Sequence, residues 1–528
     1  MSSTRANPAG TVTTRVSYGP YIADPLAMYY QLCHDCPNTM LLESAEIDSK
    51  DNLKSVLLLQ SALRFECHGA QVRVRALNNN GDNALSALTQ FLQPFLQQRT
   101  VDEALFEFAS AEPQADEDTR LKTPNVLSVL RCAVQDFSTQ QSDTHPFRTF
   151  LGGCFAYDLL AMAETLPDVP NGANTCPDYV FYLAQDICVI DHTEQTTTLI
   201  SNIFSGVETT ATEQALHEHW LTRLAEPVST LQEAHPPTSV QQEVIVSEDK
   251  DDAAFCQDVI NLKEHILAGD IFQVVPSRTF SLACPSAILA YAELKVQNPS
   301  PYMFYLKDEQ FELFGASPES ALKYTAQTNQ VEIYPIAGTR PRGKRSDGTI
   351  DHDLDSRIEL NLREDLKEKS EHIMLVDLAR NDVARVSEPG TRHVKELLKV
   401  DRYSHVMHLV SRVVGQLRHD VDALHAYQAC MNMGTLVGAP KVSAATLIRE
   451  VEQQRRGSYG GAVGYLDADG DMDTCIVIRA AFVQDGQAHV QAGAGVVFDS
   501  VPQAEADETR AKAQAVINAI ISSQGGHA

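Results

Sequence analysis

Residues 251–280 read DDAAFCQDVINLKEHILAGDIFQVVPSRTF, and the expectation for the fold starts from this stretch. Apolar side chains at Phe255, Val259, Leu262 and Ile266 recur at helical spacing. Gly269 follows at the position of a helix C-cap, and residues 271–280 then have the character of a strand. The stretch therefore predicts a helix that leads directly into a strand.

The rest of the second half continues this mixture of elements. We expect paired strands at 311–313 with 320–324, and at 461–466 with 474–482 around Asp469-Gly470. Long helices are expected over 355–380 and 502–520. Hairpins interleaved with long helices favour an α+β fold, with layered sheets and flanking helices, over a doubly wound parallel sheet.

The first half also mixes helices and strands. Asp24 followed by Pro25 predicts the start of a helix that runs through Leu32. Short strands are expected at 39–44, 179–183 and 187–190. Prolines and an acidic run interrupt the hydrophobic pattern between residues 226 and 252. We therefore expect a domain boundary near residue 245, between domains of residues 1–245 and 246–528.

Composition restricts the class of partner. The 528 residues include 42 Lys and Arg against 70 Asp and Glu, a formal net charge of −28. Such an acidic surface repels nucleic acid and anionic lipid, so neither is expected as a partner. The 11 cysteines are thinly spread, and no secretory signal or apolar run of about 20 residues occurs. These features predict a soluble cytoplasmic protein.

Some short motifs fail on inspection. Residues 338–344 resemble a phosphate-binding loop, but Arg345 stands where a serine or threonine would be needed. Residues 493–495 lack the third glycine of a dinucleotide-binding turn, because Phe498 occupies that position. The Cys33–Cys36 spacing has no second metal-binding pair, so it is interpreted as an ordinary helix end.

Two pairs of glutamates are candidate metal ligands. Glu368 and Glu371 are three residues apart in one expected helix, as are Glu505 and Glu508 in the last one. A solvated helix surface is the simple alternative. However, an apolar run follows Glu371 and a glycine-bearing strand precedes Glu508. Oxygen ligands from separate helices, with room for water and substrate, are what magnesium prefers.

Arg479 is a candidate anion-binding residue, because it lies in an apolar stretch with strand character. Its charge requires a partner, which could be an internal salt bridge or a substrate carboxylate held by two parallel hydrogen bonds. Tyr459 could add a hydroxyl, and Gly338 and Thr339 could add backbone and hydroxyl donors. Together with a divalent cation, this set suits a small dianionic substrate better than a phosphate ester.

The motifs, taken in order, resemble those of the chorismate-utilising enzymes, and among them the large subunits (component I) of anthranilate synthases. The resemblance is dense from about residue 250 onward and sparser before it. The segments that carry it are residues 41–44, 271–278, 298–303, 315–320, 335–343, 371–382, 401–405, 434–441, 475–482 and 493–509.

The resemblance implies conversion of chorismate and ammonia to anthranilate and pyruvate, with Mg2+ required. It implies Glu371 and Glu508 as metal ligands, with Glu368 and Glu505 behind them. Glu319 is implied as the general acid, and His408 and Thr435 as candidates for the second step. The substrate would be held by Gly338, Thr339, Tyr459, Arg479, Gly493, Ala494 and Gly495.

Two positions separate this chain from relatives within the family. Water-using relatives carry a lysine base where this chain has Gln273, and a neutral amide cannot deprotonate water. Relatives that attack chorismate through a lysine carry it where this chain has Ala337. Both positions favour direct addition of ammonia at C2, which gives the 1,2-substituted product.

The resemblance also implies regulation and a partner. Ser44, together with Pro301, Tyr302 and Met303, is similar to the L-tryptophan feedback site of the family. This would make residues 1–245 a domain that contributes to feedback and residues 246–528 the chorismate-binding domain. No Cys-His-Glu amidotransferase segment is expected in the chain. Ammonia from glutamine is therefore expected to come from a separate glutamine amidotransferase subunit (component II).

Overall fold

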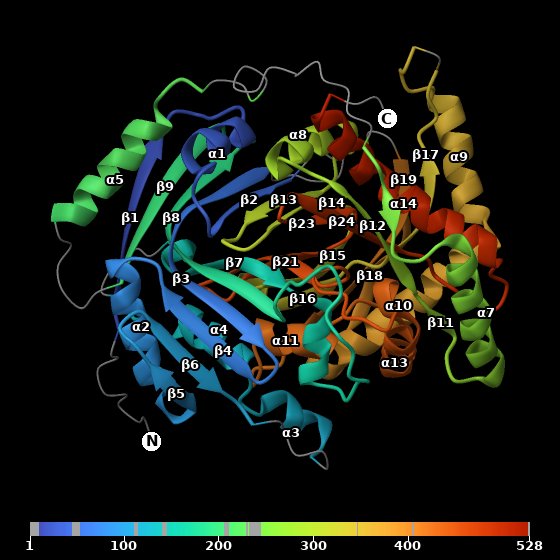
Figure 1. Cartoon of the computed structure of the whole chain (residues 1–528), viewed down its shortest axis with the longest axis horizontal. Coiled ribbons are helices and arrows are strands. Elements are labelled where there is room, and N and C mark those ends of the chain that lie inside the picture. The colour runs from blue at the N-terminus through green and yellow to red at the C-terminus, as the bar shows by residue number, and fades with distance from the viewer. Residues whose placement is uncertain are drawn as a thin grey trace.

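The computed structural model describes residues 10–44, 53–109, 115–139, 145–204, 211–228, 231, 244–345, 347–403 and 406–525. Strands fill the interior of the molecule, and helices cover its outer faces (Figure 1). The predicted α+β fold, with sheets flanked by helices, is confirmed. No helix among these residues is both long and apolar enough to cross a membrane.

The described part of the first half contains nine strands, β1 to β9, and the helices that cover them. Its elements are β1 (Val12–Gly19), α1 (Pro25–Cys33), β2 (Thr39–Glu43), β3 (Lys54–His68), β4 (Gln71–Ala76), α2 (Asn79–Phe91), η1 (Gln93–Phe95), β5 (Leu96–Arg99), β6 (Glu103–Glu107), α3 (Glu117–Lys122), α4 (Leu127–Gln135), η2 (Pro146–Arg148), β7 (Phe150–Phe155), η3 (Tyr157–Met162), β8 (Tyr179–Asp191), β9 (Thr196–Phe204) and α5 (Ala211–Leu224).

The second half contains the longer helices. Its elements are β10 (Ser247–Glu248), α7 (Asp252–Ala268), β11 (Gln273–Val274), β12 (Ser277–Ala283), α8 (Ala287–Gln297), β13 (Tyr302–Lys307), β14 (Glu312–Ser317), β15 (Ser320–Thr325), η4 (Ala326–Thr328), β16 (Gln330–Ile333), β17 (Ile336–Pro341), α9 (His352–Glu364), α10 (Leu366–Val386), β18 (His393–Arg402), β19 (Val406–Gln416), α11 (Ala423–Cys430), α12 (Gly434–Val437), β20 (Gly438–Ala439), α13 (Lys441–Glu452), β21 (Ala462–Asp467), β22 (Met472–Ile476), β23 (Ala480–Gln484), β24 (Gln487–Gly493) and α14 (Pro502–Ser523).

Strands from both halves share one hydrogen-bonded network. It runs β12–β24–β23–β14–β13 in the second half, then β2–β3–β8–β7 in the first, and returns through β21–β22–β15–β16–β19. Glu43 is paired with Met303, and Phe155 with Ala462. The boundary near residue 245 stays a prediction, and the sheet crosses it twice.

The hydrophobic core lies on both faces of these strands. On one face, Tyr29 of α1, Tyr291 of α8 and Ile517 of α14 pack with Leu41 and Phe314 of the strands. Burying one such side chain stabilises the fold by about 1.5–3 kcal/mol. The packing of α8 and α14 against the strands positions the N-terminal turns of α14, which carry Glu505 and Glu508.

The helix ends predicted from capping residues are confirmed. The Asp24 side chain accepts a hydrogen bond from the Ala27 N–H at the start of α1. α7 ends at Gly269, whose φ of 87° is left-handed. β21 and β22 form the expected hairpin, although β22 ends at Ile476 and residues up to 482 continue into β23. The last helix also forms, as α14.

The hairpin expected between 311–313 and 320–324 is wrong. β14 pairs with β13 and β23, whereas β15 pairs with β16 and β22. Only Pro318 and Glu319 separate β14 from β15, and Pro318 has no N–H to donate to a turn. The chain therefore steps from one set of strands to the other at this point.

Three element boundaries also differ from expectation. The helix predicted over 355–380 is two helices, α9 and α10, because Asp365 is extended and its side chain caps the Glu368 N–H. The strands predicted at 179–183 and 187–190 are one strand, β8, with register irregularities against β3. The strand predicted at 271–280 divides into β11 and β12 at Val275-Pro276.

Candidate active site

Glu319 and Arg479 lie where two chain segments cross from one set of strands to the other. Glu319 separates β14 from β15, and Arg479 lies between β22 and β23. The Ile476 N–H donates to the Glu319 carbonyl at 3.0 Å, and the Ala316 N–H donates to the Arg479 carbonyl at 3.1 Å. These backbone bonds connect the two crossings and hold both side chains in one place.

Arg479 was predicted within a strand, and this is wrong. Its φ is 49°, a left-handed conformation that costs a residue other than glycine about 1–3 kcal/mol. Such a conformation cannot continue a strand, so β22 stops before Arg479 and β23 starts after it. From this position the charge of Arg479 acts on both Glu319 and His408.

Glu319 has the environment of a protonated carboxyl group. The side chain is 6% exposed, and Thr435 Oγ1 donates to its Oε1 at 3.2 Å. Burial raises the pKa of Glu319 to about 8, although the Thr435 hydrogen bond, the Ile336 N–H and the charges of Lys512 and Arg479 lower it. At neutral pH this carboxyl group is therefore predominantly protonated and can donate a proton.

Arg479 is a half-buried cation, and we find no carboxylate partner for it among the described residues. No described Asp or Glu forms an ion pair with its guanidinium. Burial lowers the pKa of Arg479, while Tyr403 and Glu319 raise it, and a guanidinium remains charged at neutral pH. Because even partial desolvation of a charge without a counterion is costly, this arrangement favours an anionic ligand over the internal salt bridge.

His408 and Thr339 form a second pair beside Arg479. They are opposite each other in the β17–β19 pairing, and Thr339 Oγ1 lies 2.9 Å from His408 Nδ1. Burial, followed by the charge of Arg479, lowers the pKa of His408 to about 3. The imidazole is therefore neutral, and its ring packs edge-on against Tyr403 at 5.2 Å between centroids.

Gly493 and Gly495 allow close approach of two other candidate residues. A Cβ on Gly493 would lie 2.7 Å from the Pro276 carbonyl oxygen and 3.0 Å from the Tyr459 hydroxyl. A Cβ on Gly495 would lie 2.9 Å from Gln273 Nε2. Ala494, between them, donates its N–H to the Pro276 carbonyl. The end of β24 and the following residues therefore lie between Tyr459 and Gln273.

Gln273 offers an unused acceptor. The residue is 6% exposed on β11, and its Oε1 accepts no hydrogen bond from any described group. An unsatisfied buried amide oxygen costs about 1–3 kcal/mol. Such an atom is commonly explained by a ligand or by strain in a functional site.

The candidate metal ligands lie on two sides of this region. Glu368 lies against Gly338, whose added Cβ would be 3.0 Å from Glu368 Oε2, and it pairs with Arg340 at 2.9 Å. Glu508 pairs with Lys512 at 2.7 Å, and Lys512 also donates to the Gly493 carbonyl. Glu371 is half-buried and Glu505 is buried.

These glutamates fit magnesium only if water and substrate complete its coordination shell. Across the described ranges, no three His, Cys, Asp or Glu side chains come together as a metal cluster. Magnesium usually takes one or two carboxylates and completes its shell with water and substrate. The two glutamate-bearing helices, α10 and α14, suit that mode of binding rather than an all-protein cage.

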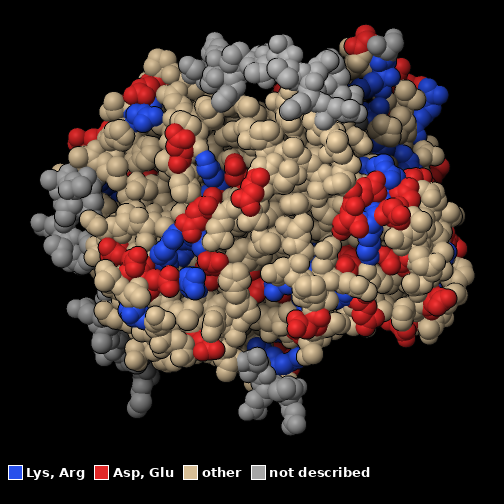
Figure 2. All heavy atoms as spheres, viewed as in Figure 1, with Lys and Arg blue, Asp and Glu red and all other residues tan. Residues whose placement is uncertain are grey.

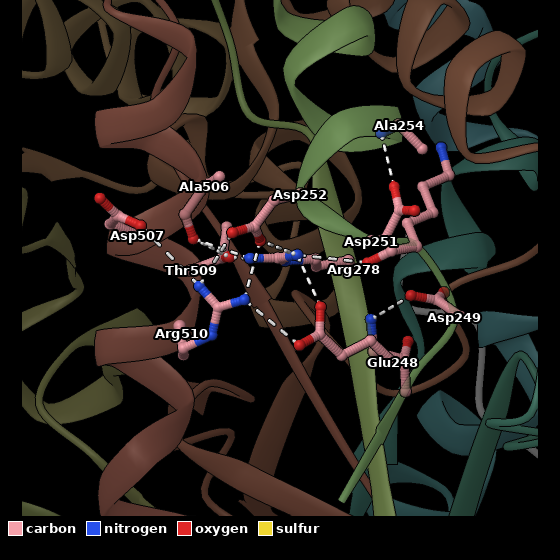
Figure 3. A network of polar contacts seen from close by, with 12 residues as sticks. Glu248, Asp249, Asp251, Asp252, Ala254, Arg278, Ala506, Asp507, Thr509 and Arg510 are labelled. Atoms are coloured by element: carbon pink, nitrogen blue, oxygen red, sulfur yellow. Dashed lines mark hydrogen bonds and ion pairs between the residues drawn. The ribbon is translucent and has the colours of Figure 1, made fainter.

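A buried arginine holds α14 against the strands. Arg278 of β12 donates to Thr509 Oγ1 and to the Ala506 carbonyl of α14, both at 2.9 Å. It also pairs with Glu248 and Asp252, which in turn bind Arg510 (Figure 3). This network positions the turn that carries Glu505 and Glu508.

Sequence reasoning did not assign roles to Arg278, Lys512 or Tyr403. Lys512 follows Glu508 by four residues, and that spacing on one helix face could have indicated the pair. Arg278 lies in a strand of apolar character, which could have indicated a buried structural cation. Nothing in the local sequence around Tyr403 indicated that it lies beside Arg479 and His408.

The segments predicted to form a feedback site are also neighbours. The β2–β13 pairing sets Glu43 opposite Met303, so Ser44 follows beside Tyr302. Met303 is buried, and the Tyr302 hydroxyl donates to Asp473 at 3.2 Å. Pro301 precedes the strand. Residues from both halves therefore meet here.

The chain was compared with known proteins. A family model described as chorismate binding enzyme matches residues 59–518. Anthranilate synthase component 1 from Vibrio cholerae is 57% identical over 511 residues, covering 96% of both chains. The protein of the same name from Escherichia coli K12 is 54% identical over 505 residues, covering 95% of both chains.

Two solved structures have similar folds. Anthranilate synthase component I from Streptococcus pneumoniae superposes with a TM-score of 0.70 at 26% identity, covering 93% of this chain and 97% of that one. The menaquinone-specific isochorismate synthase from Escherichia coli has a TM-score of 0.64 at 17% identity, covering 97% and 95%, and shows similarity of fold alone.

Proposed function

This chain belongs to the chorismate binding enzymes, and from that premise we propose that it converts chorismate and ammonia to anthranilate, pyruvate and water. The observation that carries the proposal is the buried Glu319, whose raised pKa keeps it protonated near Arg479, which pairs with none of the described carboxylates. A reaction that expels a hydroxyl from a dianion needs both an acid and a cation. The names of the relatives support the choice of reaction.

Substrate binding would use the groups around Arg479. Chorismate has two carboxylates, and the Arg479 fork would hold the one on the enolpyruvyl group, with the Tyr459 hydroxyl beside it. Thr339 and the backbone of Gly338 would contact the ring of chorismate, in the part of the site nearest Glu368. Residues 493–495 would line the floor, where the lack of side chains at Gly493 and Gly495 lets Tyr459 and Gln273 approach closely.

Glu319 would drive the first step. Ammonia attacks C2, the ring double bonds shift, and the bond between C4 and its hydroxyl breaks. Glu319 gives its proton to the leaving hydroxyl, which departs as water, and regains a proton from the newly bound ammonium. Thr435 holds Oε1 so that the carboxyl group keeps one orientation.

In the second step the ring becomes aromatic. The proton at C2 is lost, the bond between C3 and the enol ether oxygen breaks, and the released enolpyruvate gains one proton to become pyruvate. His408, which is neutral in the site, is the candidate proton acceptor, with Thr339 fixing its ring. Thr435 is the other candidate for this step, and its hydroxyl would keep its hydrogen bond to Glu319.

Glu371 and Glu508 would hold Mg2+, with Glu368 and Glu505 behind them. When bound, the ion supplies positive charge to the ring carboxylate and neutralises it. The remaining contribution of the chain is to keep these carboxylates apart on α10 and α14, so that water and substrate complete the coordination.

Gln273 and Ala337 support ammonia over other nucleophiles. The Gln273 amide is neutral and cannot act as a base toward water, whereas its free Oε1 can accept a hydrogen bond from ammonia. Ala337 has no amine to attack C2 itself. Isochorismate synthesis is the second candidate, because one structural neighbour carries that name. Gln273 disfavours it, since its amide cannot deprotonate water.

Ammonia would be supplied by a glutamine amidotransferase subunit, which is supported by the designation component 1 in the relatives. L-Tryptophan would bind near Ser44, Pro301, Tyr302 and Met303 and favour a less active arrangement of the chain, so that chorismate and tryptophan weaken each other's binding.

We propose that the reaction takes place in the cytoplasm, in keeping with eleven free thiols.

The test is a product assay with the purified chain, chorismate, an ammonium salt and Mg2+. We expect blue-fluorescent anthranilate, identified by chromatography against aminodeoxychorismate and isochorismate standards. Replacing ammonium by sodium should abolish the signal, and Glu319→Gln should reduce it by about 10²–10⁴. Formation of isochorismate, or no product in the presence of both additives, would refute the proposal.

A further inference from the structure

A cavity of about 270 Å³ lies between α3 and α13. We call it the α3–α13 cavity, because Arg120 of α3 and Arg449 of α13 both line it. None of the described residues that were assigned above to the substrate, Mg2+ or tryptophan lines it. A cavity of about 150 Å³ is enough to hold benzene, so this one has room for a small organic molecule.

Segments from both halves of the chain form the walls of this cavity. Arg120 and Leu159 come from the first half, and Gln428 and Arg449 come from the second. The Asn125 side chain donates to Gln428 Oε1 at 3.0 Å, and α3 contacts α11, the helix that carries Gln428. A molecule bound in the cavity would therefore contact both halves.

Two buried ion pairs hold these walls in place. Arg449 donates to Asp158 at 2.8 Å, and Arg455 pairs with Asp178. The two carboxylates are 2% and 5% exposed, and each also accepts a hydrogen bond from a backbone N–H. The guanidinium of Arg449 and the backbone N–H of Arg455 donate to carbonyl groups of residues 167–170, at 2.8 and 2.9 Å. These two arginines are therefore neutralised within the chain and do not require a ligand.

Among the described residues, Arg120 has no carboxylate partner, although the exposed Asp168 also lines the cavity. The Nε of Arg120 is shielded from solvent and donates to no described group. The chain has 70 acidic residues for 42 basic ones, and in Figure 2 many Lys and Arg lie beside Asp or Glu. A cation that lacks a carboxylate partner in so acidic a chain indicates that an anion from outside binds in the cavity.

Apolar side chains also line the cavity. Phe108, Val126 and Leu159 belong to the hydrophobic core, and the half-buried Met162 packs against it. An inorganic anion would leave this apolar surface uncovered, whereas an organic acid would cover it. The edge of a guanidinium formed by Nε and one Nη matches a carboxylate through two parallel hydrogen bonds. The lining therefore suits a carboxylate with a compact apolar body.

We propose that the α3–α13 cavity binds a small organic carboxylate, with its acidic group on Arg120 and its apolar body against Leu159 and Met162. The volume restricts the ligand to about one aromatic ring and its carboxylate. This site is independent of the reaction proposed above, because no residue that lines the cavity takes part in that reaction. A ligand that binds only the folded chain should also raise its thermal stability.

The test uses 4-fluorobenzoate as the probe and fluorine NMR as the readout. Its matched control is 4-fluorobenzamide, which has the same shape without the charge. Because Arg479 could also hold a benzoate, the titrations are made in the parent chain and in Arg479→Ala. We expect both proteins to bind 4-fluorobenzoate with a dissociation constant in about the millimolar range. The amide should bind at least about tenfold more weakly.

Substitutions of Arg120 identify the group that holds the carboxylate. In the Arg479→Ala background, Arg120→Gln should weaken 4-fluorobenzoate binding at least about tenfold and abolish the rise in melting temperature. Arg120→Lys keeps the charge without the fork and should give an intermediate affinity. Arg73→Gln, at an arginine on β4 whose side chain is 56% exposed, should leave the affinity unchanged. In the chain with Arg479 intact, Arg120→Gln should keep ammonia-dependent turnover within about twofold, because it lies outside the candidate active site.

A second measurement locates the ligand without changing Arg120. The methyl resonance of Met162, assigned with Met162→Leu, should shift when 4-fluorobenzoate is added, because the ring would pack against this side chain. An unmoved Met162 resonance would overturn the proposal, as would equal affinities of the Arg120→Gln and Arg73→Gln proteins. Equal binding of the amide and the benzoate would also contradict it, and so would benzoate binding that disappears entirely in Arg479→Ala.

Discussion

Thr435 Oγ1 lies 3.2 Å from Glu319 Oε1 and donates a hydrogen bond to it, although 116 residues separate the two in the chain. Thr435 is on α12, and Glu319 lies where the chain crosses between strands. The hydrogen bond lowers the pKa of Glu319, yet burial outweighs it and the pKa remains near 8.

Glu319→Gln should lower kcat with ammonia by about 10²–10⁴, because the amide cannot give a proton to the leaving hydroxyl. KM for chorismate should change little, since Glu319 is not proposed to bind the carboxylates. Steady-state fluorescence assays measure both constants. Glu319→Asp, which keeps an acid at an altered distance, should retain more activity than Glu319→Gln. Equal rates for the parent and the Gln variant would remove Glu319 from the mechanism.

The rate and the stability should both depend on the ionisation of Glu319. Because the protonated form is required, kcat/KM should fall as the pH rises above about 8. The raised pKa also makes the folded state lose stability between about pH 4.5 and 8, where the unfolded carboxyl group is ionised and the folded one must hold a proton.

Glu319→Gln removes that penalty. Urea unfolding should therefore find the variant more stable than the parent by about 1–3 kcal/mol at pH 8, with the difference shrinking toward pH 5. A difference that is independent of pH would show that the Glu319 carboxyl group does not titrate with a raised pKa.

Arg479→Ala should raise KM for chorismate by about 10–100-fold, because two charge-assisted hydrogen bonds to a carboxylate are lost. Arg479→Lys keeps the charge but not the fork and should fall between the parent and the alanine variant. The same change should raise the pKa of His408, since the charge of Arg479 contributes to lowering it. NMR titration of His408 gives a readout independent of turnover, and an unmoved pKa would place Arg479 away from His408.

Glu371→Gln and Glu508→Gln should each weaken Mg2+ activation by at least about tenfold, because each removes one charged oxygen ligand. The Mg2+ dependence of turnover and direct calorimetric titration in the presence of a chorismate analogue measure the change. Glu364→Gln, at an exposed position at the end of α9, is the matched control. An identical Mg2+ dependence in all three variants would argue against both assigned ligands.

Ser44→Ala and Met303→Thr should move the tryptophan inhibition curve to higher concentration by about tenfold while leaving uninhibited turnover within about twofold. Ser44 directly follows β2, and Met303 lies on the neighbouring strand β13, so the two variants would change the proposed site from opposite halves of the chain. Ser356→Ala, an exposed serine on α9, should leave the curve in place. Superimposable curves for all variants would place the feedback site elsewhere.

The order of the motifs along the sequence was sufficient to identify the family, and the family model and the relatives confirm this identification. It was also sufficient wherever an element carries its own start or stop signal. Asp24 and Pro25 begin α1, and Gly269 ends α7, because caps act on backbone groups within three or four residues. These interactions are local, so their outcome does not depend on the rest of the fold.

Tertiary structure decided the features that depend on distant partners. β14 and β15 are adjacent in sequence, but their pairing is set by β23 and β22, about 160 residues away, and this opens the crossing that holds Glu319 and Arg479. The raised pKa of Glu319 likewise arises from burial by residues far along the chain. Strand pairing and desolvation both depend on many residues that are distant in the sequence. Residue identity and spacing could therefore identify Glu319 as the candidate acid, but they could not predict its raised pKa.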